Sequence, residues 1–333
     1  MNPLSRTLSA AALTATLALA AAPFAQAQQP AAAAATDYPS KPIRFVVPFP
    51  PGSGTDVGAR FFARKLGELT GQPVIVDNRA GANGFIAVKA VTSAPADGYT
   101  LLMGSNSTLA TNVALFKQLP YDPVKDLAPV STLMRSPIVL IVPAQSPYKT
   151  LKDLIDAARA KPGQTTFASG SAAYQLMGEL FSEKAGIKLL NVPYKGAPEA
   201  VNATISAQTD LGFADITATM ELLRGGKLRA LAIAADQRLA GLADVPTARE
   251  QGIAGFSGDT WTGVAAPANT PKPVVDKLSE LFVKILAMPE TIEFYAKQNV
   301  VVMKGGQDEL RSFQREQIEV WKRIASSAKI ELQ

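Results

Sequence analysis

The fold is decided where the sequence reads IRFVVPFPPGSGTD, residues 43–56. Residues 43–47 form an apolar, β-branched run that predicts a buried strand, which Pro48 closes. A helix over 55–69 is expected next, with Thr55 as its cap and Asp56 in its first turn, where an acid complements the helix dipole. A strand that leads into a helix through a short glycine-rich loop is typical of a parallel α/β sheet.

The same alternation continues along the chain in two runs. The first run predicts strands over 73–76 and 99–103 and a helix over 84–92. The second predicts strands over 138–142, 165–168, 189–192, 211–213 and 228–234, and helices over 151–160, 172–185 and 198–207. The last part is mainly helical, with apolar residues on one face over 274–286 and with Phe313, Gln317, Val320, Trp321 and Ile324 on the inner side of the final helix.

Two such runs predict an α/β protein of two domains, each a mostly parallel sheet covered by helices. A length of 333 residues points the same way. We expect the chain to cross between domains near 142–143 and within 260–271. Domain 1 then comprises residues 38–141 and 262–333, and domain 2 comprises residues 142–261.

Composition excludes several classes of chemistry. The chain has no His and no Cys, so a catalytic triad, a cysteine nucleophile, a redox pair and a Cys/His zinc site are all excluded. No calcium loop occurs either, and we predict neither a cofactor nor a metal. With 33 basic and 28 acidic residues the net charge is +5, and the basic residues are scattered, which argues against a nucleic-acid partner.

The first 27 residues read as an export signal. Arg6 supplies the charged start, residues 10–22 are apolar, and Ala25-Gln26-Ala27 forms a small-residue cleavage site. The apolar stretch is shorter than a membrane-spanning helix needs, although an anchored helix is the alternative. We therefore expect a soluble, periplasmic protein with a flexible leader over 28–37.

The loop over 48–56 is the first candidate binding site. In parallel sheets, ligands bind beyond the carboxyl ends of the strands, and a helix start offers unpaired amide groups to an anion. Gly52 and Gly54 allow close approach of the backbone, and Ser53 and Thr55 add hydroxyl groups. A triphosphate fits poorly because no Lys follows Gly54, and the glycine spacing is wrong for a dinucleotide. The alternative is a plain connecting loop.

Similar small polar loops follow other predicted strands, at 104–107, 169–172 and 194–196. Because they are divided between the two units, they predict a site where two domains face each other. Two S-x-x-K matches, at 146–149 and 326–329, are a weak signal for a serine enzyme without the companion motifs. A periplasmic enzyme that uses Asp, Lys or Ser therefore remains a minor alternative.

At this point the chain resembles the Bug family, the periplasmic solute-binding proteins of tripartite tricarboxylate transporters. The resemblance rests on ordered segments across the whole mature chain: 38–43, 47–56, 76–84, 97–102, 119–123, 192–196, 226–232, 244–247 and 265–267. It implies a two-domain clamshell of the type II periplasmic-binding-protein fold without catalytic activity. It also implies a small carboxylate ligand and a membrane permease of one large and one small subunit, with a signalling role as the alternative; we expect a monomer.

The resemblance also implies a set of ligand-binding residues. In the first domain these are Phe49, Pro51, Gly52, Ser53, Gly54, Thr55, Asp56, Asn78, Asn83, Ser105 and Asn106. In the second they are Ser169, Gly170, Ser171, Ala172, Gln175, Tyr194 and Asp215. The family often has Gly where Ser53 stands and His where Gln175 stands, so we expect these two positions to affect the choice of ligand.

Overall fold

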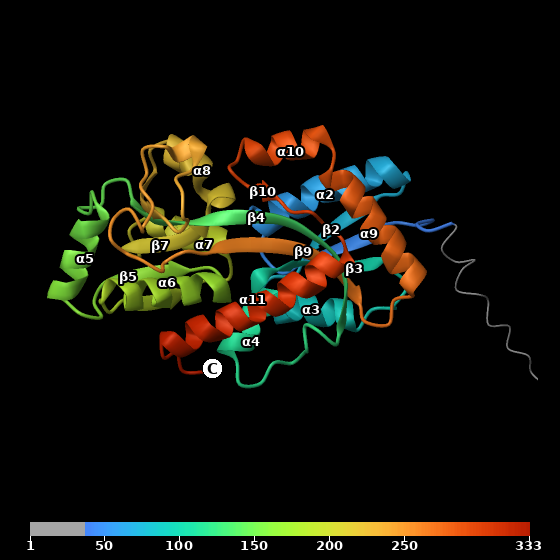
Figure 1. Ribbon diagram of the computed structural model, residues 1–333, viewed down its shortest axis with the longest axis horizontal. Helices are drawn as coiled ribbons and strands as arrows, with labels where there is room; N and C mark the ends of the chain where they lie inside the picture. Colours follow the sequence, from blue (N-terminus) through green and yellow to red (C-terminus); the bar gives the residue numbers. More distant parts are fainter. Residues whose placement is uncertain (1–36) are drawn as a thin grey trace, which may run out of the picture.

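The structure is a computed structural model and describes residues 37–333. The predicted export signal at 1–27 and all of the predicted leader except Asp37 lie outside this range. Within it, ten strands form one continuous sheet in the order β2-β1-β3-β9-β4-β7-β5-β6, with β10 and β8 also paired to β4. Helices cover the sheet on both sides of two lobes (Figure 1).

Lobe 1 contains the N-terminal strands and the C-terminal helices. Strand β1 (Ile43–Val47) pairs in parallel with β2 (Val74–Asn78) and β3 (Thr100–Ser105), as the sequence predicts. Antiparallel strands complete this half of the sheet: β9 (Asp259–Pro267), β4 (Leu127–Pro143) and β10 (Val301–Val302). The helices are α2 (Gly54–Thr70), η1 (Ala82–Gly84), α3 (Phe85–Thr92), η2 (Ser107–Thr111), α4 (Asn112–Leu115), α9 (Lys272–Leu286), α10 (Pro289–Ala296) and α11 (Gln307–Ser327).

Lobe 2 repeats this plan with the middle of the chain. Strand β5 (Thr166–Ser169) pairs in parallel with β6 (Leu190–Pro193) and β7 (Leu211–Asp215). Strands β7 and β8 (Leu228–Ile233) each pair antiparallel with the end of β4. The helices are α5 (Leu151–Ala160), α6 (Ala172–Ala185), α7 (Ala197–Ile205), α8 (Ile216–Arg224) and η3 (Ala240–Leu242). Each lobe therefore has three parallel strands joined to antiparallel ones.

Strands β4 and β9 are the longest strands and connect the lobes (Figure 1). Strand β4 pairs with β9 as far as Pro137, opposite Asp259, and from Ile138 it pairs with β7. The sequence predicts only 138–142 of β4 and no strand over 259–267. Pro, Ser, Gly and Ala, which are depleted in strands, occupy many of the missed positions. The chain therefore changes sheet at 137–138, a few residues before the expected crossing, and the exact domain bounds stay a prediction.

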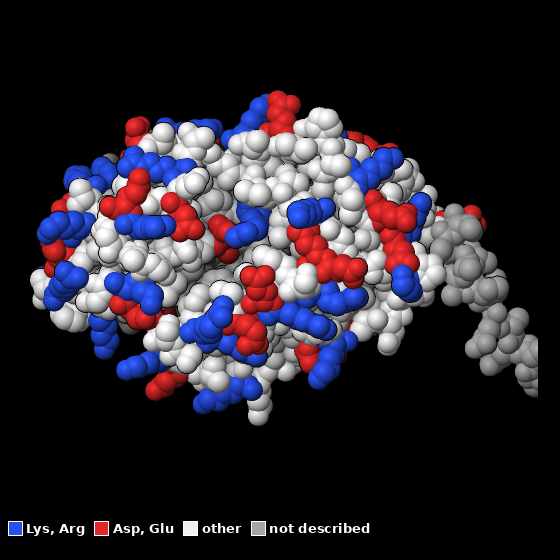
Figure 2. Space-filling model, viewed as in Figure 1, with Lys and Arg blue, Asp and Glu red and all other residues white. Residues whose placement is uncertain are grey.

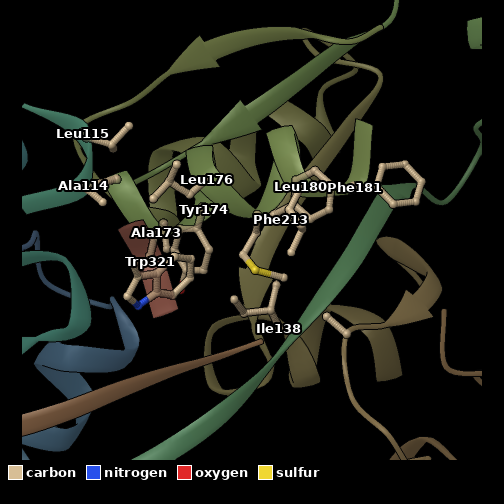
Figure 3. Packing of buried hydrophobic residues seen from close by; sticks show 14 of the residues in the cluster. Ala114, Leu115, Ile138, Ala173, Tyr174, Leu176, Leu180, Phe181, Phe213 and Trp321 are labelled. Atoms are coloured by element: carbon tan, nitrogen blue, oxygen red, sulfur yellow. The ribbon is translucent and has the colours of Figure 1, made fainter. Parts of the chain in front are cut away.

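Helix α11 ties the two lobes together. Its Trp321 packs beside Ala173 and Tyr174 of α6 and near Ala114 of α4 (Figure 3). Close to the helix end, the hydroxyl of Ser327 donates to Glu183 at 2.9 Å. Because α4 belongs to lobe 1 and α6 to lobe 2, this apolar cluster spans the boundary between the lobes.

The buried face of α11 differs from the predicted one. The fully buried residues are Leu310, Gln314, Ile318, Trp321 and Ala325. The predicted inner residues other than Trp321, namely Phe313, Gln317, Val320 and Ile324, are only half-buried and line a shallow groove. The prediction left out polar Gln314, whose side-chain amide donates to the carbonyl oxygens of Leu109 and Pro123 at 2.9 and 3.0 Å. Of the predicted residues, Trp321 is buried, and Phe313 and Ile324 pack against the core.

Charges of both signs are interspersed over the face shown in Figure 2. No helix within residues 37–333 combines the length and the apolar character that crossing a membrane requires.

We predict that Gln314→Leu destabilises the protein by about 1–3 kcal/mol, because the carbonyl oxygens of Leu109 and Pro123 lose the donor that they share. The measurement is urea unfolding followed by circular dichroism. The matched variant is Gln317→Leu, one turn along the helix and half-buried, which should change stability by less than about 0.5 kcal/mol. Equal effects of the two variants would contradict this register of α11.

Candidate functional site

A cavity lies between the two lobes, where strands end and helices begin. Lobe 1 lines it with Phe49, Ser53, Gly54, Thr55, Ser105 and Asn106, and lobe 2 lines it with Gly170, Ser171, Tyr174, Ala197, Asp215 and Thr217. The connecting strands β4 and β9 supply Met134, Ser136, Thr260, Trp261 and Thr262. The space left between these side chains is about 30 Å³, which holds about two water molecules.

The loop that leads into α2 is held in shape by Asp56. Its carboxylate accepts hydrogen bonds from the Gly52 amide at 2.9 Å and the Asn78 side chain at 2.9 Å, and it pairs with Arg60 at 3.0 Å. Asn78 also donates to the carbonyl oxygen of Phe49 at 3.0 Å. Burial acts to raise the pKa of Asp56, but these three donors outweigh it and lower the pKa below its usual value. Asp56 is therefore ionised at neutral pH.

The first turn of α2 leaves two amide groups facing the cavity. Ser53 caps the helix, and its hydroxyl oxygen accepts from the amide of Asp56 at 3.2 Å. Among residues 37–333, the amides of Gly54 and Thr55 have no hydrogen-bond acceptor. Unpaired amides at a helix start carry partial positive charge and bind anions.

Three buried side-chain groups around the cavity also lack partners in the described part of the chain: the amide nitrogen of Asn106, the indole nitrogen of Trp261 and the hydroxyl of Thr262. Buried polar groups are normally hydrogen-bonded, because an unpaired one costs about 1–3 kcal/mol. Their grouping around one cavity indicates that they are available to a polar ligand.

Lobe 2 presents three helix starts to the same region. Ser171, Gly196 and Asp215 are the N-cap residues of α6, α7 and α8. Asp215 accepts from the amide of Ala218 at 3.0 Å and from the hydroxyl of Tyr174 at 2.6 Å. Burial raises the pKa of both Asp215 and Tyr174 above their usual values. Tyr174 therefore stays a neutral donor to Asp215.

The lobes touch each other directly around the cavity. A Cβ atom placed on Gly54 would lie 2.7 Å from a carboxylate oxygen of Asp215, and one on Gly196 would lie 2.4 Å from the Cδ atom of Pro50. The amide of Ala173 in lobe 2 donates to the Ser107 hydroxyl in lobe 1 at 3.4 Å. Glycine is needed at 54 and 196 for this close approach of the lobes.

Nine of the residues that the sequence singles out line the cavity: Phe49, Ser53, Gly54, Thr55, Ser105, Asn106, Gly170, Ser171 and Asp215. Asn83 and Tyr194 line an outer groove with Phe49, Gly170, Lys195 and Glu199. Pro51 and Gly52 are exposed on the loop, and Asp56 and Asn78 brace it. Ser169 bonds to Asn191, Ala172 is buried outside the lining, and Gln175 is half-buried on α6 outside the lining. Their roles in binding stay a prediction.

Sequence reasoning missed the lining residues on the connecting strands, which are Met134, Ser136, Thr260, Trp261 and Thr262. These strands carry no motif, and their sequence does not show that they pass beneath both lobes. It also missed Tyr174, Ala197 and Thr217, although each lies within three residues of a predicted strand-to-helix loop or of Asp215.

Neither catalysis nor metal binding gains support. In the first S-x-x-K match, Ser146 accepts from the amide of Tyr148, and Lys149 bonds to the Ser146 carbonyl oxygen instead of its hydroxyl. Within residues 37–333, no group of three or more acidic side chains is placed to hold a metal ion.

Comparison with known proteins gives one consistent picture. Residues 58–330 match the family described as the tripartite tricarboxylate transporter family receptor. The protein BugT of Bordetella pertussis is 37% identical over 290 residues, which cover 86% of this chain and 89% of BugT.

Several solved structures are similar to this chain over most of its length. The periplasmic binding protein BugD is 31% identical with a TM-score of 0.84, covering 89% of this chain and all of BugD. A protein of R. palustris solved with adipate is 30% identical with a TM-score of 0.86, covering 89% and 100% of the two chains. MatC of Rhodopseudomonas palustris, solved with bound malate, is 31% identical with a TM-score of 0.81, covering 86% and 99%.

We predict that Asn78→Ala lowers the free energy of unfolding by about 1–3 kcal/mol, because the Phe49 carbonyl oxygen and Asp56 lose a shared donor. Urea unfolding at neutral pH measures it. The neighbouring variant Asp77→Ala removes only ion pairs to Arg79 and Arg44 near the surface and should cost about 0–1 kcal/mol. A smaller loss for Asn78→Ala than for Asp77→Ala would contradict the bracing role.

Proposed function

We propose, from the premise that this chain belongs to the tripartite tricarboxylate transporter receptor family, that it captures a small organic acid between its two lobes. The chain is a solute-binding receptor and not an enzyme, and its fold is the two-domain clamshell of periplasmic binding proteins. Two structural relatives were solved with adipate and with malate, which supports a carboxylate ligand for this chain as well.

One observation carries the proposal. The cavity between the lobes is lined with unpaired donors, namely the α2 amides and the side chains of Asn106, Trp261 and Thr262, but in the described residues no Lys or Arg lines it. A carboxylate is thus bound by fixed, neutral dipoles. Each hydrogen bond to a charged group contributes about 1.5–3 kcal/mol, so three or four suffice for micromolar binding after the cost of association.

Binding is coupled to closure of the lobes. In the separated form, water competes for the α2 amides, and closing around the ligand excludes that water and lowers the local dielectric constant. A ligand that contacts both lobes binds the closed form better and shifts the population toward it. The strands β4 and β9 are where the lobes meet, so they are the place for the hinge.

The closed, loaded form is the form that a membrane partner recognises. The family works with tripartite transporters, and we infer a permease of one large and one small subunit as the partner. We further infer that the protein is an exported periplasmic monomer, released from the signal at 1–27.

Binding is tested with the mature protein and a panel of acids: succinate, glutarate, adipate, malate, benzoate, aspartate and glutamate. The temperature of thermal unfolding should rise for at least one acid. At a hundredfold excess of ligand over Kd, the free energy of unfolding should increase by about 2.7 kcal/mol. The uncharged analogue succinamide is the control for succinate. An unfolding temperature that no acid changes would contradict the proposal. The bound acid should also be recovered chemically unchanged, because the protein carries its ligand and does not convert it.

The Trp261 side chain gives a second readout because it lines the cavity, whereas Trp321 does not. We expect ligand addition to change tryptophan fluorescence in Trp321→Phe, in which Trp261 is the remaining tryptophan. Unchanged fluorescence in Trp321→Phe on addition of an acid that binds would place the ligand elsewhere.

We predict that Gly54→Ala weakens ligand binding while the protein remains folded. The added methyl group would meet Asp215 on closure, and overpacking of this kind costs about 1–3 kcal/mol, or about 5- to 150-fold in Kd. Calorimetric titration measures it. The matched control is Gly67→Ala in the same helix, where the nearest atom is the Gln72 carbonyl oxygen of lobe 1. Equal affinity of both variants would show that the lobes do not close at Gly54.

A further inference from the structure

Asp215 is the one acidic side chain among the described residues that line the cavity, and no basic side chain lines it. It is 4% exposed and makes no ion pair with any residue of 37–333. Its partners are the neutral hydroxyl of Tyr174 and the amide of Ala218. A buried carboxylate without a cation is costly, so its place in a binding cavity calls for a reason.

The groups that face Asp215 from each side are neutral. Helix α6 presents Tyr174, the strands β4 and β9 present Ser136 and Thr260, and α2 presents Gly54. Asp56 is the nearest acid on α2, but it is paired with Arg60 and does not line the cavity. Among the described residues, no basic side chain therefore pairs with Asp215, and no second acid lies beside it in the cavity.

Asp215 also stands beside the anion site of lobe 1. Its carboxylate oxygen packs against Gly54, whose amide is one of the two unpaired donors at the start of α2. A ligand carboxylate on those amides comes close to Asp215 when the lobes close. Two carboxylates at that separation repel each other strongly unless a proton or a positive group lies between them.

We propose that Asp215 selects ligands with an ammonium group next to the carboxylate, so that the solute is an α-amino acid. The inference rests on the proposed function and narrows it. The ligand carboxylate binds the α2 amides of Gly54 and Thr55, and its own ammonium group lies between that carboxylate and Asp215. The hydroxyls of Ser136 and Thr217, 3.4 Å apart, also line the cavity and offer further acceptors.

The simpler role of Asp215 is to cap α8, and the two roles make different predictions. A cap needs one oxygen that accepts the Ala218 amide, and Asn provides it as well as Asp. Asp215→Asn therefore keeps the cap and the size of the side chain, and removes the negative charge. If capping is the whole role, this variant binds the same ligands as the native protein.

The test compares acids that differ only in the amino group: alanine with propionate, aspartate with succinate, and glutamate with glutarate. Calorimetric titration of the native protein should show that at least one amino acid binds about 10- to 100-fold more tightly than its partner. In Asp215→Asn that preference should fall by a similar factor. Asp153→Asn, an exposed capping acid on α5 outside the cavity, is the matched control and should keep the preference.

Each outcome decides something. If the native protein binds plain acids as tightly as their amino partners, the inference is wrong and the proposed function stands. If it binds none of the six compounds and none of the wider acid panel, the proposed function fails too. If plain acids bind with uptake of a proton, so that Kd rises with pH, a shared proton replaces the ammonium group and the inference is overturned. The native protein alone answers these points, should Asp215→Asn fail to fold.

Discussion

The candidate binding site depends on the hydrogen bonds that Asp56 makes around the loop before α2. By accepting from Gly52 and Asn78 and pairing with Arg60, Asp56 directs its negative charge away from the first turn of α2. Ser53 takes the third amide of the helix as its cap. The amides of Gly54 and Thr55 are what remains, and both lie at the cavity. A carboxylate at the start of α2 therefore meets partial positive charge from lobe 1, with Asp215 of lobe 2 beside it.

This arrangement explains how an anion site works without a basic residue. A Lys or Arg side chain in a closed cavity would have to lose its water each time the lobes shut, which is expensive unless an ion pair forms. Backbone amides are held in place by the helix and need no reorganisation. However, they bind any carboxylate and do not distinguish ligands by the rest of the molecule. Ligand identity must then come from the opposite lobe and from β4 and β9, which supply Asp215, Trp261 and Thr262.

Much of the fold could be predicted from the sequence, because strands 43–47 and 211–213 and helices 151–160 and 172–185 follow strong periodic patterns. The loop at 48–56 could also be identified from the sequence as a candidate site, because its glycine and hydroxyl residues are neighbours in the chain. What could not be predicted depends on contacts between distant segments. Strand β9 has a weak local signal, and Gln314 is buried only because two carbonyl oxygens from lobe 1 accept its amide.

Two positions depart from the family pattern, and their effect on the choice of ligand stays a prediction. Ser53 lines the cavity, and its hydroxyl oxygen accepts from the amide of Asp56. Gln175 is half-buried on α6 and does not line the cavity. A change of charge alters affinity more than a change between neutral polar groups, because a closed cavity screens charge poorly. Asp215 is therefore the residue that we propose as the main determinant of ligand choice.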